Sequence, residues 1–139
     1  MADQVYIGVD FGRRRIGLSR SDGSGLIASA YKTITYKSIK KAVKEIAADC
    51  AEFEAVGVVV GYPVAPDGGE HGESCLMVDD FITRLEKQID IPICRIDERD
   101  TSAEAEAMIH RHKKKIGKDK ARIDRMAAAI ILQRFLDER

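Results

Sequence analysis

The stretch GVDFGRRRIGLS, residues 8–19, places an aspartate, Asp10, at the end of an apolar run that begins at Val5. The run VYIGVD is typical of a buried β-strand, and Gly12 followed by arginines is typical of a tight turn. Ile16–Ser19 then predicts a strand that returns beside the first. A carboxylate carried out of a buried strand is rare unless it is paired, hydrogen-bonded or bound to a metal. Asp10 is therefore the first candidate functional residue.

Length and composition predict one soluble globular domain, residues 1–139. The chain has 139 residues, which is enough to bury a core. No apolar run approaches the ~18 residues of a transmembrane helix, and the N-terminus has no signal-peptide pattern. The cysteines, Cys50, Cys75 and Cys94, form no CxxC pair. We expect free thiols, at least two of them buried, in a reducing cytoplasm.

The remaining chain alternates between strand and helix patterns. Ala28–Thr35 predicts the third strand of an antiparallel meander. Ser38 predicts the N-cap of a helix whose apolar face runs from Ile39 to Cys50. The continuous apolar run Ala55–Pro63 predicts a central strand buried on both faces. The further elements expected are a loop over 63–74, a helix through Val78, Phe81, Ile82, Leu85 and Ile89, a strand over Ile91–Asp97, a short helix opened by the capping box at Thr101, and a last helix that starts near Asp124. This order predicts an α/β fold with a mixed five-stranded sheet and helices on both faces.

Three acids stand where such a sheet could bring them together. Asp10 ends the first strand, Glu98 follows the strand that ends in IPICRID, and Asp124 opens the predicted last helix. Three adjacent carboxylates repel one another unless a cation joins them, and oxygen ligands at an open edge suit Mg²⁺ or Mn²⁺. Two such ions can activate a water and stabilise the leaving oxygen in phosphodiester cleavage. Alternatively, Asp10 caps a turn, Glu98 pairs with Arg99, and Asp124 is an ordinary helix N-cap.

Basic residues are unevenly distributed although the formal net charge is zero. One group, Arg13, Arg14 and Arg15, follows Asp10 directly. The other is the segment His110–Arg125, in which the candidate nucleic-acid-binding residues are Lys113, Lys114, Lys115, Lys118, Lys120 and Arg122. Such groups are usually solvated surfaces, but beside a cleft they would hold a polyanion through phosphate contacts. The chain has no tryptophan, so base stacking contributes little, and Tyr62 is the best-placed candidate for one stacking contact.

Four blocks, GVDFGRRRIGLSRSD, VVVGYPVAPDG, IDERDTSAEAE and IDRMAAAIILQRFLD, occur in this order between Val5 and Asp137. Together they resemble the YqgF (RuvX) family of ribonuclease H-like proteins. The resemblance implies a ribonuclease H-like fold, cytoplasmic location and an Mg²⁺- or Mn²⁺-dependent nuclease. It also implies that Asp10, Glu98 and Asp124 are the family's three acidic positions, and that the substrate is the 5′ end of precursor small-subunit ribosomal RNA.

Some positions depart from the family pattern. The family often has Thr and Lys where this chain has Arg13 and Arg14, and Leu before the proline where it has Tyr62. Asp100 adds a charge after the IDER block. None of these departures removes an acid, but the changed residue at Tyr62 could alter the choice of substrate.

Three other functions remain open at this stage. The chain could resolve four-way DNA junctions, which normally requires a two-fold dimer. No dimer surface can be recognised in the sequence, so we expect a monomer or weak homodimer and favour structured RNA. The chain could also be a non-catalytic nucleic-acid-binding module of the same fold. An actin-like ATPase is the least favoured alternative, because the chain is short and has no Walker A motif.

Overall fold

A computed structural model of the chain describes residues 4–63, 73–97 and 120–139. Its elements are β1 (Tyr6–Phe11), β2 (Arg15–Ser21), β3 (Ala28–Thr35), α1 (Ile39–Glu52), β4 (Gly57–Tyr62), α2 (Glu73–Glu86), β5 (Ile93–Asp97) and α4 (Lys120–Glu138). They confirm the predicted alternation of strands and helices. The helix predicted at Thr101 lies outside the described residues.

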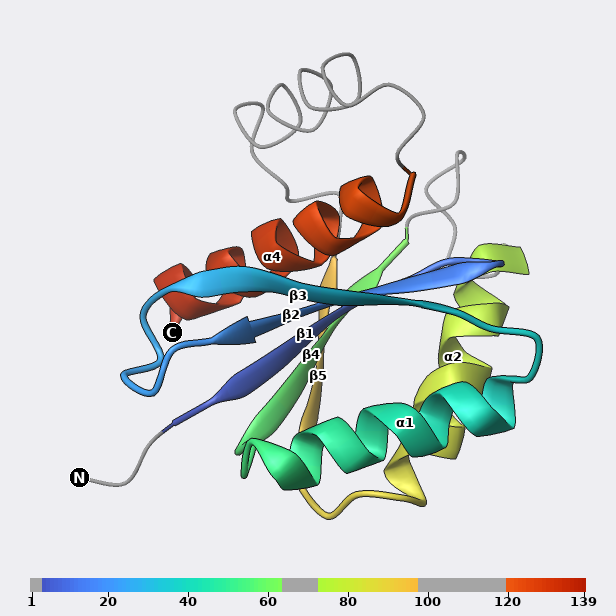
Figure 1. The fold of residues 1–139 in the computed structure, drawn as a ribbon, viewed down its shortest axis with the longest axis horizontal. Coiled ribbons are helices and arrows are strands. Elements are labelled where there is room, and N and C mark those ends of the chain that lie inside the picture. The colour runs from blue at the N-terminus through green and yellow to red at the C-terminus, as the bar shows by residue number, and fades with distance from the viewer. Residues whose placement is uncertain (1–3, 64–72, 98–119) are drawn as a thin grey trace.

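The five strands form one mixed sheet in the order β3-β2-β1-β4-β5 (Figure 1). β1, β2 and β3 pair antiparallel as the predicted meander, and β1–β4 and β4–β5 pair parallel. β4 occupies an inner position, as its continuous apolar run predicted. Successive side chains of β4 point to opposite faces of the sheet and both faces are buried, because Val58 and Val60 lie in one core cluster and Val59 in the other.

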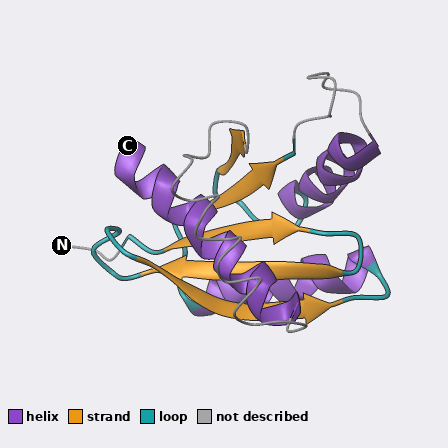
Figure 2. Ribbon diagram, turned by 90° about the horizontal axis from the view of Figure 1, so that it is seen from above, coloured by secondary structure: helices purple, strands orange, loops and turns teal. Residues whose placement is uncertain are grey.

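Helices cover both faces of the sheet. α1 and α2 pack on one face through the larger core cluster, in which Phe81, Ile46 and Leu85 are fully buried. α4 crosses the strands on the opposite face, where Leu132 and Val59 are fully buried (Figure 2). The predicted cap of α1 is confirmed, since the Ser38 hydroxyl accepts a hydrogen bond of 3.3 Å from the Lys41 amide. Among the described residues, no helix is long and apolar enough to span a membrane.

Several predicted element boundaries differ from the structure by two to four residues. α4 begins at Lys120, so Asp124 lies inside the helix and is not its N-cap. The Thr33 hydroxyl donates to the Ala121 carbonyl, and this contact with β3 supports the first turn of the helix. α2 ends at Glu86, before Ile89, and β5 begins at Ile93 instead of Ile91. Proline at position 92 has no amide hydrogen to donate to a neighbouring strand.

The cysteines behave as predicted. Cys50 and Cys75 are buried, Cys94 is exposed, and all three are free thiols. Burial in the core raises the pKa of the Cys50 thiol to about 11, with the nearby Asp49 carboxylate adding to the effect.

α4 lies unusually close to the sheet because two strand positions are glycine. A methyl group on Gly17 would overlap the Asp124 carbonyl oxygen, and one on Gly8 would come 2.9 Å from the Ala128 carbonyl oxygen. Directly opposite Gly8 on β2, the buried Ser19 hydroxyl donates a hydrogen bond of 2.7 Å to the same Ala128 carbonyl. The helix backbone therefore rests directly on the β1–β2 backbone.

We expect the substitution Gly17→Ala to lower the free energy of unfolding by about 3 kcal/mol, because the added methyl group meets backbone that cannot rotate away. Urea unfolding followed by circular dichroism measures this. Ser29→Ala, an exposed position on β3, is the control and should change stability by less than about 0.5 kcal/mol. Equal stability of the two variants would show that α4 can shift away from the sheet at little cost.

Candidate active site

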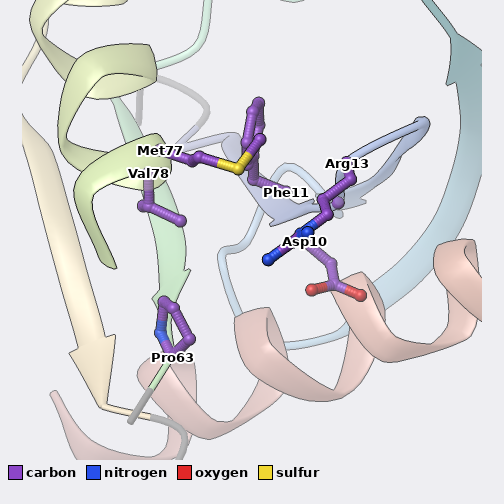
Figure 3. Close-up of a pocket in the computed structure, with 7 residues that line it drawn as sticks. Asp10, Phe11, Arg13, Pro63, Met77 and Val78 are labelled. Carbon is purple, nitrogen blue, oxygen red and sulfur yellow. The ribbon is translucent and has the colours of Figure 1, made fainter. Parts of the chain in front are cut away.

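Asp10 lies near the end of β1 on the face of the sheet that α4 covers. It pairs with Gly17 across β1 and β2, and directly opposed residues of antiparallel strands point to the same face. Gly17 faces α4, because its missing side chain would meet the Asp124 backbone. In agreement with this, Figure 3 shows the Asp10 carboxylate directed toward α4. Asp10 and Asp124 are thus brought to the same end of the same face, as the sequence predicted.

Asp124 is held by an arginine of β2. The Arg15 Nε donates a hydrogen bond of 2.7 Å to Asp124 Oδ2, and the two side chains are 29% and 24% exposed. A charge-assisted bond of this length fixes the orientation of the carboxylate. Arg15 was predicted to hold nucleic acid, whereas the structure places it as the partner of a candidate metal ligand. The interpretation of Asp124 as a helix N-cap is wrong, since its carboxylate lies one turn inside α4.

The third predicted acid, Glu98, lies outside the described residues. β5 ends immediately before it, at Asp97, and Ile96 on the same strand packs in the cluster beneath α4. Within residues 4–63, 73–97 and 120–139, no group of three His, Cys, Asp or Glu side chains could hold a metal ion. The described part of the site therefore supplies two carboxylates, Asp10 and Asp124, to a possible cation.

An open cleft adjoins Asp10 (Figure 3). Its volume is about 160 Å³, and it is lined by Asp10, Phe11, Gly12, Arg13, Pro63, Met77 and Val78. One wall is apolar and rigid, because the Phe11 ring stacks on the buried Phe81 ring with centroids 4.8 Å apart. The cleft thus combines a carboxylate and a guanidinium with an apolar wall formed by Phe11 of β1 and by Met77 and Val78 of α2.

The turn that carries Arg13 and Arg14 is held in place by one tyrosine. The turn closes with a hydrogen bond of 3.0 Å from the Gly12 amide to the Arg15 carbonyl. The Tyr36 hydroxyl donates to the Gly12 carbonyl at 2.7 Å, and the Tyr36 amide donates to the Arg14 carbonyl at 3.2 Å. Both arginines are exposed beside the cleft, where they could meet a phosphate.

Tyr62 lies on the other face of the sheet. Its ring packs against the core beneath α1 and α2, and its hydroxyl donates a hydrogen bond of 3.0 Å to Asp79 Oδ2. Burial, followed by the Asp79 carboxylate, raises the pKa of Tyr62 to about 12. Base stacking by this residue stays a prediction, and any base would compete with these contacts.

The lysine-rich segment is only partly described. Lys120 and Arg122 are exposed in the first turn of α4. The other predicted nucleic-acid-binding residues there, Lys113, Lys114, Lys115 and Lys118, lie outside the described residues.

Comparison with protein families finds a match to the model described as RuvX, Holliday junction resolvase, over residues 4–138. The chain is also 41% identical to the "Putative pre-16S rRNA nuclease" of Crocosphaera subtropica over 133 residues, 96% of this chain and 92% of that protein. It is 39% identical to the protein of the same name from Chloroflexus aggregans, covering 100% of this chain and 97% of that one.

Solved structures share the fold at low sequence identity. Thermus thermophilus RuvC, in complex with a Holliday junction substrate, superposes with a TM-score of 0.60 at 17% identity, covering 97% of this chain and 94% of that chain. The Fowlpox virus resolvase in its Holliday junction DNA complex gives 0.59 at 9% identity, covering 97% and 98%. These likenesses confirm the predicted ribonuclease H-like fold.

The Arg15–Asp124 pair should be measurable as a coupling energy. We expect Arg15→Gln and Asp124→Asn each to lower the free energy of unfolding. The loss in the double variant should be smaller than the sum of the two single losses by about 1 kcal/mol. Urea unfolding of all four proteins at low and high salt gives this value. Strict additivity would mean that the pair contributes nothing to holding α4 at this position.

Proposed function

Because the chain belongs to the RuvX (YqgF) family, we propose that it is a divalent-metal-dependent endonuclease that acts on precursor small-subunit ribosomal RNA. One observation supports the chemistry most strongly: Asp10 and Asp124 converge on one face at the end of the sheet, beside an open cleft. The names of the relatives from Crocosphaera and Chloroflexus support the substrate. Relatives of this name align along nearly their whole length, so the proposal concerns the entire domain.

The described residues fit a hard divalent cation. Asp10 and Asp124 offer carboxylate oxygens from two elements packed directly together, and Glu98, the residue after β5, would complete the set. Such oxygen donors suit Mg²⁺ or Mn²⁺. When bound, the ions would activate a water for attack on a phosphodiester and stabilise the leaving oxygen.

The chain's own side chains prepare the site. Arg15 keeps the Asp124 carboxylate oriented through its Nε hydrogen bond of 2.7 Å. Arg13 and Arg14, on a turn held by Tyr36, would bind phosphates on either side of the scissile bond. The apolar wall formed by Phe11 and Val78 would limit water to one side of the cleft. Phosphate contacts of this kind make binding salt-sensitive and largely independent of sequence.

Cleavage of four-way DNA junctions is the second candidate. The description of the family model and the fold shared with RuvC favour it. A junction enzyme needs two active sites related by two-fold symmetry. We therefore expect a junction-cleaving form to be a dimer, whereas a monomer suffices for RNA.

We expect the wild type to cleave a 5′ fragment of precursor small-subunit rRNA in Mg²⁺ or Mn²⁺, and not in EDTA. Asp10→Asn and Asp124→Asn should each reduce the rate by at least about 100-fold, because each removes a charged ligand from the ion. Mn²⁺ should raise the melting temperature of the wild type and not that of Asp10→Asn. Gel assays and thermal melts give both readouts.

The matched control is Asp137→Asn, an exposed aspartate of the same helix, which should retain full activity. A four-way DNA junction is tested in parallel. Cleavage of the junction alone would favour the resolvase. Intact binding of both substrates without any cleavage would favour a non-catalytic binding module.

A further inference from the structure

A basic groove is lined by residues of α1 and of the C-terminal end of α2. Both helices cover the face of the sheet opposite α4 (Figure 1). The volume of the groove is about 330 Å³, and its lining residues are Lys40, Val43, Arg84, Lys87 and Gln88. Three of these five side chains are cationic and none is acidic. The groove therefore combines a hollow surface with a concentration of positive charge.

The cations of this groove are available to a ligand. The Arg84 Nε is bound to Asp80 at 3.0 Å, but this interaction occupies only one edge of the guanidinium. Lys40 and Lys87 are exposed, and neither forms an ion pair with another described residue. By contrast Lys32, on β3, is paired with two carboxylates of α1, Glu45 at 2.8 Å and Asp49 at 2.7 Å.

The order of charged residues along α1 indicates that the lysines at its N-terminal end do not stabilise the helix. Residues 37–44 contain four lysines and no carboxylate, whereas the carboxylates Glu45, Asp49 and Glu52 follow in the second half. A helix is stabilised by the reverse order, with acids near its first turn and bases near its last. A surface that attracts an external anion accounts for the observed order.

The groove continues the basic turn at the mouth of the Asp10 cleft. Tyr36 binds that turn through the Gly12 and Arg14 carbonyls, and the next residue in the chain is Lys37. α1 follows at once and brings Lys40 to the groove. Arg13, Arg14, Lys37 and Lys40 are all exposed, so exposed cationic side chains stand at the cleft, at the groove and on the segment of chain that connects them.

We propose that the groove between α1 and α2 binds the phosphodiester backbone of a nucleic-acid strand as it continues beyond the Asp10 cleft. That the bound nucleic acid also passes through the Asp10 cleft rests on the proposed nuclease function, whereas its binding in the groove can be tested without cleavage. Lys40, Arg84 and Lys87 would each contact a phosphate, and Val43 would contact the nucleic-acid strand from below. Such contacts carry no sequence information and position the substrate.

The test is fluorescence anisotropy in EDTA, with a labelled RNA hairpin carrying a single-stranded tail and a DNA of the same sequence. Lys40→Gln/Lys87→Gln should weaken binding roughly tenfold at moderate salt, and should reduce the slope of log affinity against log salt by about 1.5, the loss expected for two phosphate contacts. An RNA trimmed to a few nucleotides around the cleavage site should bind both proteins equally.

The charge-matched control is Arg20→Gln/Arg139→Gln. These residues lie at the other end of the sheet, over the Phe53 and Tyr6 rings respectively, and their loss should change affinity less than about twofold. Thermal melts verify that both double variants are folded. A loss seen with DNA and not RNA would support the groove and identify DNA as the ligand.

Two results separate this inference from the nuclease proposal. In the first, the wild type cleaves neither substrate, and Lys40→Gln/Lys87→Gln loses affinity and salt dependence. This result supports phosphate binding in the groove and contradicts the nuclease proposal. If the wild type cuts RNA and a folded Lys40→Gln/Lys87→Gln binds both nucleic acids like the wild type, the groove is overturned and an acidic protein becomes the better partner for it.

Discussion

The direct contact between the backbone of α4 and the backbones of β1 and β2 determines the geometry of the site. Gly8 and Gly17 have no side chain on this face, and the Ser19 hydroxyl meets the Ala128 carbonyl at 2.7 Å. Any larger residue at the glycines would lift the helix by the thickness of a side chain. Asp124 would then move away from the strand that carries Asp10. Packing and chemistry are therefore not separable here, because the distance between the two acids is set by residues without functional groups.

The sequence predicted the fold well because its signals are strong and local. The antiparallel meander followed from three β-rich runs with short connections, and the inner position of β4 followed from its unbroken apolar run. The start of α4 was predicted four residues late. Its first turn contacts β3 through Thr33, 88 residues away from Ala121 in the chain, and a contact at this separation cannot be read from the local sequence.

The site was predictable in part. Asp10 could be proposed as a site residue because it stands at the end of a buried strand. Its position near Asp124 followed from the predicted topology. The pairing of Arg15 with Asp124 could not be foreseen, since it joins residues 109 positions apart and Arg15 is one of three consecutive arginines. A usable signal was overlooked: Gly8 and Gly17 interrupt strand patterns, and a glycine inside a strand often indicates close approach of another backbone.

The distribution of the thiols makes the wild-type chain convenient for spectroscopy. Cys50 and Cys75 are buried, and the pKa of Cys50 is raised to about 11, so at neutral pH it carries almost no reactive thiolate. Cys94 is exposed on the edge strand β5, three residues before that strand ends at Asp97. A maleimide dye or spin label would thus attach at one position without any cysteine being replaced, on the strand that leads toward the third acid.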